Sequence, residues 1–251
     1  MSFKSLVIAC TALSFAGAAL AAGAVPPAIS AAVANATRPA ADKARDADRK
    51  PAELIAFAGI KPGDKVGDIV PGGGYFTLIF AKTVGTAGKV YAIVPQELVK
   101  ARAAAADPVK QIAAEPGYGN VNVVVAPLDN FKVPEALDVA WTSLNYHDMH
   151  TQLMGPTNMG AYNKAVFNAL KPGGIYIVID HAATLGAGNS VAEDLHRIDP
   201  QSVEAEVTGI GFVLVEKSDL LAHPADDHNT RVFDSGVRGK TDQFVMKFRK
   251  P

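Results

Sequence analysis

The sequence predicts an α/β protein built on a doubly wound, mostly parallel sheet in three layers. Strand-like and helix-like segments alternate from residue 65 to residue 180, which is the pattern of a parallel sheet covered by helices. The segment 121–126 shows almost no polar alternation, as is typical of a parallel strand buried on both faces. The last two strand-like segments, 212–216 and 243–248, are joined without a convincing long helix, so we expect them to be antiparallel neighbours.

The length and net charge of the chain limit the number of domains and the kinds of partner that we expect. The chain has 251 residues, which corresponds to one or two domains if a domain has roughly 150 residues. Its hydrophobic content of 49% is sufficient for a large core. Its 24 Lys and Arg against 25 Asp and Glu leave a net charge of −1, without the basic excess typical of nucleic-acid or anionic-membrane binding. We therefore expect one domain and no nucleic-acid partner.

Residues 1–24 have the features of a signal peptide. Lys4 precedes the uncharged run 6–20, and two small-x-small sites follow, so cleavage is expected to leave a new terminus at Ala22 or Val25. A retained anchor and lipidation at Cys10 are the alternatives, but the run is short and rich in Ala and Gly. The protein is thus expected to be exported, periplasmic or secreted, with no stable membrane insertion after cleavage. Cleavage removes Cys10, the only cysteine, which excludes disulfides and cysteine nucleophiles.

The elements after the signal peptide are expected in the following order. Residues 25–41 carry turn formers and no convincing core pattern, which favours a linker. The segment 43–58 is charged and then apolar, with Pro51 able to begin a helix and Gly59 to end it. Strands are then expected at 65–70, 89–94, 121–126, 137–144, 175–180, 212–216 and 243–248, and helices at 75–84, 96–114 and 158–170.

The connection between the last two strands is long for a compact domain. It runs for about two dozen residues and contains turn formers such as Pro224 and Gly236. Long loops of this kind are often functional.

A glycine-rich turn follows the first strand. Pro71, Gly72, Gly73 and Gly74 stand directly between the strand 65–70 and the helix 75–84. Ligands of open α/β sheets bind at the carboxyl ends of strands, where glycines let them approach the backbone and the helix terminus. An ordinary tight turn would also explain three glycines, so this turn alone does not decide between the two interpretations.

All six histidines lie between residues 147 and 228. His147 and Asp148 follow the fourth strand and His181 ends the fifth, so these three are expected to face one crevice as catalytic or substrate-binding residues. Hydrogen bonds that only fix loops are the alternative role for these three residues.

Two other kinds of site have no motif in this sequence. No established metal-binding motif is present, so no metal site is assigned, and no G-x-S-x-G motif of a serine hydrolase is present. Arg197 is expected to pair with Asp199 or with an acidic substrate. The remaining histidines are expected to be structural or exposed: His150, His196, His223 and His228.

Three segments resemble class I S-adenosylmethionine-dependent methyltransferases: 68–74 (DIVPGGG), 127–131 (PLDNF) and 169–174 (ALKPGG). More closely, the chain resembles a group of exported bacterial predicted methyltransferases through 45–51 (RDADRKP), 145–148 (NYHD) and 238–242 (RGKTD). The resemblance covers a methyltransferase-like domain from residue 42 to residue 251. It implies a seven-stranded sheet with an antiparallel last strand.

The resemblance also implies a cofactor site for S-adenosylmethionine. Asp68 and the turn of Pro71, Gly72, Gly73 and Gly74 would hold its methionine end, Asp129 its adenine amino group, and the backbone at Leu144 and Asn145 would lie beside its sulfonium. Two positions depart from the family pattern. Val70 stands where the family has its first glycine, and Pro95 and Gln96 replace the acid expected after the second strand, with Glu97 nearby at the expected helix start.

The function that follows is methyl transfer from S-adenosylmethionine to a small acceptor. His147, oriented by Asp148, would accept a proton from the nucleophile. Two other functions remain open: a non-catalytic ligand-binding protein on the same scaffold, and a metal-dependent hydrolase using His147, Asp148 and His181.

Two further segments each have two possible roles. The charged run 42–50 would either be a solvated helix face or cap the cofactor pocket. The segment 238–242 would either hold the last strand in place or close over substrate.

Overall fold

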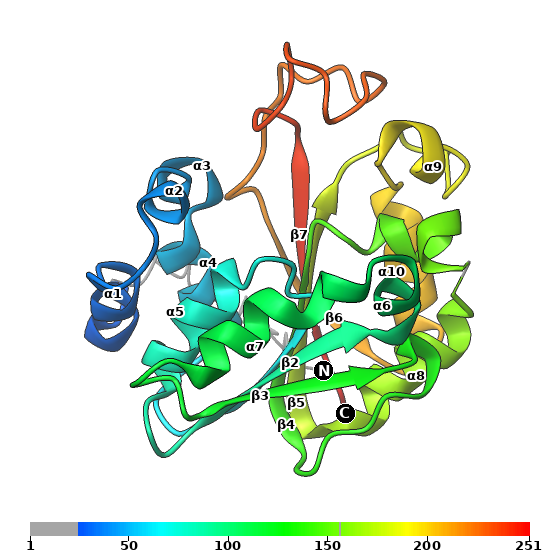
Figure 1. Ribbon diagram of the computed structural model, residues 1–251. Helices are drawn as coiled ribbons and strands as arrows, with labels where there is room; N and C mark the ends of the chain where they lie inside the picture. The colour runs from blue at the N-terminus through cyan, green and yellow to red at the C-terminus, as the bar shows by residue number, and fades with distance from the viewer. Residues whose placement is uncertain (1–24, 156) are drawn as a thin grey trace, which may run out of the picture.

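The strands form one sheet in the order β3-β2-β1-β4-β5-β7-β6 (Figure 1). The computed structural model describes residues 25–155 and 157–251. Strands β1 to β5 are parallel to one another, and β7 is antiparallel to both of its neighbours, β5 and β6. The predicted α/β fold with a mostly parallel seven-stranded sheet and an antiparallel last strand is confirmed. The strands are β1 (Lys65–Ile69), β2 (Lys89–Pro95), β3 (Val121–Ala126), β4 (Leu137–Ser143), β5 (Leu170–His181), β6 (Val213–Ser218) and β7 (Gln243–Arg249).

Helices cover both faces of the sheet (Figure 1). One apolar cluster joins α1, α4, α5 and α7 to the sheet, and the other joins α8 and α10 to the opposite face. The helices are α1 (Pro27–Val33), α2 (Ala40–Lys43), α3 (Asp46–Arg49), α4 (Pro51–Ala58), α5 (Tyr75–Val84), α6 (Gln96–Ala101), α7 (Asp107–Ala114), α8 (Met159–Ala169), α9 (Ala192–Leu195) and α10 (Pro200–Thr208). Short 3-10 turns are η1 (Ala103–Ala106), η2 (Leu128–Asn130), η3 (His147–His150) and η4 (Gln152–Met154).

Alternation along the buried strands explains why the sheet has two cores. In β4, Val139 and Trp141 belong to the cluster with α5, whereas Ala140 between them belongs to the cluster with α8. Successive strand residues point to opposite faces, so a strand with helices on both sides is apolar at most of its positions.

The order of the strands reverses between β1 and β4. From β1 the chain builds outward through β2 to β3, and it then returns to the other side of β1 to place β4 and β5. The carboxyl ends of β1 and β4 therefore border the switch point, where open α/β sheets bind their ligands.

Several sequence-based expectations about individual elements are wrong. Strand β3 lies at the edge of the sheet, not between two neighbours, and Val125 is 43% exposed. Residues 25–41 are not a linker, because they contain α1, whose Ile29 and Ala32 are buried in the core. The helix expected at 96–114 is divided into α6, η1 and α7, since Arg102 is extended and α7 starts at Asp107 with Pro108 in its first turn.

Two further differences concern helices. The segment 43–58 contains the end of α2, then α3 and α4, and Lys50 at φ +42 separates the last two. Helix α10 was not predicted, although Asp199 caps it by accepting a hydrogen bond from the Gln201 backbone N–H at 2.8 Å and Pro200 begins it. These are the helix-start signals that the sequence carried.

The expected signal peptide, with Cys10, lies outside the described residues. Within 25–155 and 157–251, no helix has both the length and the apolar character required to cross a membrane.

Candidate active site

The glycine turn joins β1 to α5 and leaves its backbone open on one side. Gly72 and Gly74 have φ values of +56° and +83°, which favour glycine. A Cβ atom at Gly74 would lie 2.3 Å from Ile112 Cδ1, so this glycine permits close packing of α7. A Cβ atom at Gly72 would meet nothing within 4 Å among the described residues. Gly72 therefore presents free space beside the backbone, as a ligand-binding turn requires.

Two branched side chains have a left-handed backbone at the ends of adjacent strands. Val70 after β1 has φ +55° and Leu144 after β4 has φ +60°. Asn145 ties these ends together, because its Nδ2 donates to the Val70 carbonyl at 3.0 Å while its Oδ1 accepts from Thr142. Such strain is uncommon outside functional sites. Val70 thus keeps the backbone conformation typical of glycine at the position where the resemblance expects one.

Asp68 is a buried carboxyl at the end of β1. It is 4% exposed and accepts a hydrogen bond from Thr77 Oγ1 at 2.6 Å. Burial raises the pKa of Asp68 to about 7, although the Thr77 hydrogen bond and the charge of Arg49 act in the opposite direction. A carboxyl group that ionises near neutrality and lies beside the glycine turn is suited to bind a cationic group.

Helix α3 lies over the first turn of α5. Asp46 accepts two hydrogen bonds from the Arg38 guanidinium, at 2.7 and 2.8 Å, and one from the Tyr75 hydroxyl at 2.6 Å. Burial alone would raise the pKa of Asp46, but Arg38 and Tyr75 outweigh it and lower this pKa. The Arg49 guanidinium stacks over the Tyr75 ring at 4.2 Å and donates to Ser143 Oγ at 3.5 Å. The part of the charged run in α3 therefore packs on the start of α5, directly after the glycine turn.

The remaining position assigned to the cofactor, Asp129, and Glu97, which was expected only to start a helix, follow the adjacent strands β3 and β2. Asp129 is exposed in η2, after β3. Glu97 is in the first turn of α6, where its Oε2 atom is buried and has no hydrogen-bond partner among the described residues. An unpaired carboxylate oxygen directly after β2 is a candidate for the acid that Pro95 and Gln96 do not supply.

His147 is held between two carboxylates. It is 3% exposed, and its backbone N–H donates to Asp180 Oδ2 at 2.7 Å. Its Nδ1 lies 2.8 Å from Asp180 Oδ1, and its Nε2 lies 3.3 Å from Asp148 Oδ1. Burial would lower the pKa of His147, but Asp180 and Asp148 raise it to about 10. The two carboxylates favour a protonated ring as long as no cation displaces the Nε2 proton, and Asp180 lies closer to the ring than Asp148, its predicted orienting partner. The general-base role of His147 stays a prediction.

His181 lies on the other side of this group. Its ring centroid is 6.0 Å from that of His147, and its Nδ1 lies 2.7 Å from Thr241 Oγ1. Burial lowers the pKa of His181 to about 4, so its ring is neutral. The structure therefore brings His147, Asp148 and His181 together, but fixes His181 to the segment before β7.

His196 belongs to the same group, although the sequence suggested a structural role. Its ring is perpendicular to that of His147 at 5.4 Å, and its Nδ1 lies 3.5 Å from Asp148 Oδ1. The contact joins the loop after β4 to the end of α9, a distance of almost fifty residues along the chain. A sequence pattern limited to neighbouring residues could not reveal it.

Other residues near the site stabilise loops. Arg197 pairs with Asp226 at 2.6 and 2.9 Å, not with Asp199 as expected. Both Arg197 and Asp226 side chains are fully buried, and the pair anchors the loop between β6 and β7. Two of the remaining histidines also tie loops together, as expected for a structural role. His150 Nδ1 lies 2.8 Å from Asn189 Nδ2, and His228 Nε2 lies 3.0 Å from Asp242 Oδ2.

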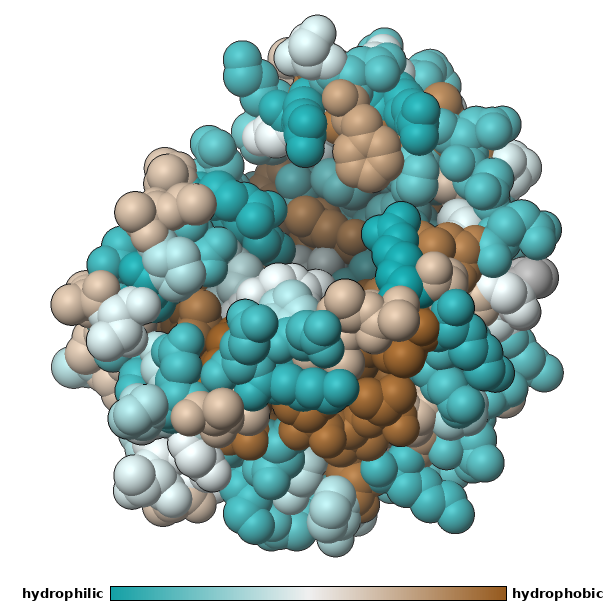
Figure 2. Space-filling view, viewed as in Figure 1, coloured by the Kyte–Doolittle hydropathy of each residue, from teal (hydrophilic) through white to brown (hydrophobic). Residues whose placement is uncertain are grey.

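The carboxyl edge of the sheet is hollowed. Figure 2 shows a depression with hydrophobic side chains at its floor, below the loop that joins β6 to β7 and beside α2 and α3. One pocket between α3 and this loop is lined by Asp48, His223, Gly236 and Lys240, among others. The pocket therefore lies beside α3, the helix that packs on the first turn of α5.

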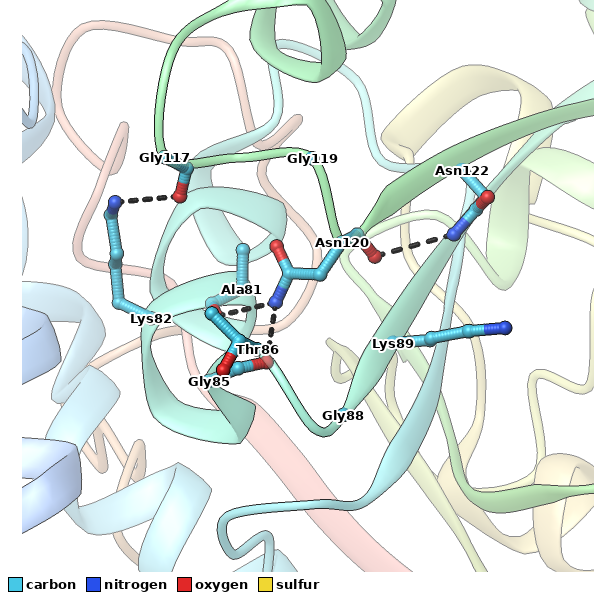
Figure 3. Close-up of a pocket in the computed structure, with 10 residues that line it drawn as sticks. All are labelled: Ala81, Lys82, Gly85, Thr86, Gly88, Lys89, Gly117, Gly119, Asn120 and Asn122. Carbon is cyan, nitrogen blue, oxygen red and sulfur yellow. Dashed lines mark hydrogen bonds between the residues drawn. The ribbon is translucent and has the colours of Figure 1, made fainter.

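A second pocket lies at the opposite edge of the sheet (Figure 3). Asn120 Nδ2 donates to the carbonyls of Ala81 and Gly85 at 2.8 and 2.9 Å, and Lys82 donates to the Gly117 carbonyl at 2.8 Å. These polar groups fix the loops at the amino ends of β2 and β3. The pocket is therefore unrelated to the strand ends where the predicted site residues gather.

The sequence matches no protein-family model and no curated protein. Solved structures do share the fold. A SAM dependent methyltransferase from Aquifex aeolicus is 17% identical, with 81% of this chain and 89% of that chain covered and a TM-score of 0.57. The glycopeptide N-methyltransferase MtfA, complexed with S-adenosylmethionine, is 14% identical over 79% and 86%, with a TM-score of 0.53. The cyclase SpnF is 16% identical over 84% and 82%, with a TM-score of 0.58.

At such low sequence identity, these structural similarities establish the fold but not the activity, which must be argued from the residues of the site. The same architecture carries methyltransferases and a cyclase among these structures. The chain has the Rossmann-like fold that these S-adenosylmethionine-dependent methyltransferases also have.

Proposed function

We propose that the protein binds S-adenosylmethionine and transfers its methyl group to a small acceptor. The observation that carries this proposal is the pair of strained residues, Val70 and Leu144, at the carboxyl ends of β1 and β4 beside the open turn at Gly72. Methyltransferases of the same fold, one of them complexed with this cofactor, support the choice of ligand.

Each part of the cofactor has a candidate partner on this chain. Asp68 would bind the ammonium group, and the turn of Pro71, Gly72, Gly73 and Gly74 would accommodate the methionine end. Glu97 would accept hydrogen bonds from the ribose hydroxyls and Asp129 from the adenine amino group. The bound cofactor supplies an electrophilic methyl group on its sulfonium.

The remaining residues would position the acceptor and exclude water. Only Tyr146 separates Leu144 and Asn145 from η3, so the strained backbone and the His147 group are on one continuous segment. Helix α3 would cover the cofactor from the other side through Arg49. Positioning the two reactants is the main contribution that a methyl transfer requires of the protein.

Calorimetric titration with S-adenosylhomocysteine and S-adenosylmethionine tests the proposal. We expect saturable heat with the wild-type protein and none with Gly72→Val, because the new side chain would fill the space reserved for the ligand. Gly173→Val is the matched control, since Gly173 also has a positive φ (+77°) and a Cβ atom there would meet nothing within 4 Å among the described residues. The control should retain binding.

One result would contradict the binding proposal, and another would contradict the assignment of the turn. No heat with either ligand at millimolar concentration would favour a different ligand on this scaffold. Equal loss of binding in Gly72→Val and Gly173→Val would attribute the effect to backbone strain and remove the turn from the site.

We also propose that the protein is exported after cleavage of residues 1–24. The support is the order of charged, apolar and small residues in that segment. The proposal of membership in an exported group of methyltransferases rests on the same segment and on the motifs at 45–51, 145–148 and 238–242.

A further inference from the structure

Two histidines and one carboxylate converge beside the hollow. One ring nitrogen each from His147 and His196 and one oxygen from Asp148 all lie within 4.8 Å of one another. Asp148 Oδ1 is central, at 3.3 Å from His147 Nε2 and 3.5 Å from His196 Nδ1. Two of these residues come from η3 and the third from the end of α9, so the fold itself brings them together.

The separations match those around a small metal ion. Ligand atoms bound to tetrahedral zinc at about 2.0–2.2 Å are roughly 3.3–3.6 Å apart. Both contacts of Asp148 Oδ1 fall in this range. The third separation, between the two ring nitrogens, is no more than 4.8 Å, so an ion would draw the rings toward each other.

Features around the three side chains also fit a metal site. Asp180, itself fully buried, contacts Nδ1 of His147 at 2.8 Å and so directs Nε2 toward Asp148. A carboxylate behind a ligating histidine is the usual way in which proteins orient such a ligand. His196 Nδ1 is buried and makes no hydrogen bond to any described residue.

The position of His196 is imposed by its backbone. It has φ +53° at the C-terminus of α9, and the next residues run beside the end of β5, where Ile198 N–H donates to the His181 carbonyl at 3.0 Å. The Phe233 ring contacts the His196 ring at 4.7 Å between centroids, tilted by 58°. Strained backbone of this kind is retained where a side chain must be held in place.

We propose that His147, Asp148 and His196 bind one divalent first-row transition metal ion. Two imidazoles and a single carboxylate are the donor set that suits zinc, iron or cobalt, whereas magnesium and calcium prefer oxygen ligands alone. Three protein ligands leave coordination positions for water or for an oxygen of a bound molecule. The site stands on its own geometry and does not require the cofactor to bind.

Metal titration of untagged protein tests this site without any cofactor. After chelator treatment and dialysis, we expect one equivalent of Zn²⁺ to bind by calorimetry and one equivalent of Co²⁺ to produce visible absorption bands. His196→Ala should lower the affinity for Zn²⁺ by more than 100-fold, beyond the roughly 10–100-fold expected for loss of the orienting carboxylate in Asp180→Asn. His223→Ala, which removes a histidine outside the cluster, is the matched control and should bind as the wild type does.

The outcomes distinguish a metal site from a cluster in which the same three side chains only form hydrogen bonds with one another. Absence of Co²⁺ bands and of stoichiometric Zn²⁺ heat in the wild type would overturn the proposal, as would equal Zn²⁺ affinity in His196→Ala and His223→Ala. Circular dichroism establishes that each variant is folded. If His147→Ala does not fold, His196→Ala still decides, because its side chain is partly exposed (19%). Failure of S-adenosylhomocysteine to bind would leave these metal readouts unchanged.

Discussion

The carboxyl of Asp68 gives the site a pH dependence that can be measured. Its folded-state pKa of about 7 is above the ordinary value of 3.8, so the folded protein binds this proton more tightly than the unfolded chain does. The contribution to the free energy of unfolding is therefore fully present below pH 4 and is lost as the pH rises through 7. We predict that Asp68→Asn has a higher melting temperature than wild type at pH 8, with a smaller difference at pH 5.

The same titration should govern ligand binding. The affinity of wild type for S-adenosylhomocysteine should fall by roughly tenfold per pH unit below 7, because only the ionised carboxyl attracts the ligand's ammonium group. Asp68→Asn should bind more weakly, with a flat profile from pH 5.5 to 7.5. A wild-type profile that is equally flat would show that Asp68 does not contact the cationic end of the ligand.

At the scale of residues, the sequence could identify groups that are adjacent in the chain. His147 and Asp148 are neighbours after a predictable strand, so their shared location was accessible from the pattern alone. Asp180 and His196 approach them only because η3, the end of β5 and the end of α9 meet in space. The contact with Asp180 raises the pKa of His147, so the sequence alone could not indicate which form of the ring this environment favours.

At the scale of elements, α3 should depend on one carboxylate. Asp46 pairs with a fully buried Arg38 side chain, so Asp46→Ala would leave an unpaired buried charge. Removal of one partner from such a pair costs about 3–5 kcal/mol, which corresponds to a fall in melting temperature on the order of 10 °C. We predict this loss together with weaker S-adenosylhomocysteine binding, measured by thermal melts and calorimetry.

The neighbouring exposed carboxylate provides the control for α3. Asp48 is exposed on the same short helix, so Asp48→Ala should change the melting temperature by only a degree or two. Equal melting temperatures for the two variants would mean that the contacts of Asp46 do not fasten α3.

Element boundaries followed from local signals where those signals were strong. The strand 121–126 and the helix 75–84 were predicted with the bounds that the structure has, because apolar runs and glycines delimit them. Helix α1 was missed because Ile29 is its single large buried side chain in an Ala-rich segment. The prediction that β3 is buried on both faces was wrong. Whether a strand is central or at the edge depends on strand order, and the hydrophobic pattern of a single strand does not indicate that order.

At the scale of the whole molecule, strand order and site location are linked. The sequence predicted parallel strands and an antiparallel ending, and these sufficed to place ligands at the carboxyl edge. The hollow itself depends on the packing of α3 and of the loop between β6 and β7, segments without regular periodicity (Figure 2). Its lining residues therefore required the structure.

If the protein is exported, signal-peptide cleavage must leave every residue that the fold requires. Helix α1 starts at Pro27, and Ile29 is 1% exposed against the core. Both proposed cleavage sites, before Ala22 and before Val25, would leave this helix intact. Intact mass of protein from the native host is therefore expected to show a chain that starts at one of these residues and that fractionates outside the cytoplasm.

A pair of truncations tests the physical side of this prediction. Deletion of residues 1–24 should leave the melting temperature unchanged, because α1 keeps its contacts. Deletion of residues 1–33 removes the buried Ile29 and Ala32, and burial of one such aliphatic side chain contributes about 1.5–3 kcal/mol. A fall of roughly 3–12 °C is therefore expected for the longer deletion. A native protein that begins at Met1 in the cytoplasm would overturn the export proposal, and equal melting temperatures of the two truncations would remove α1 from the stabilised core.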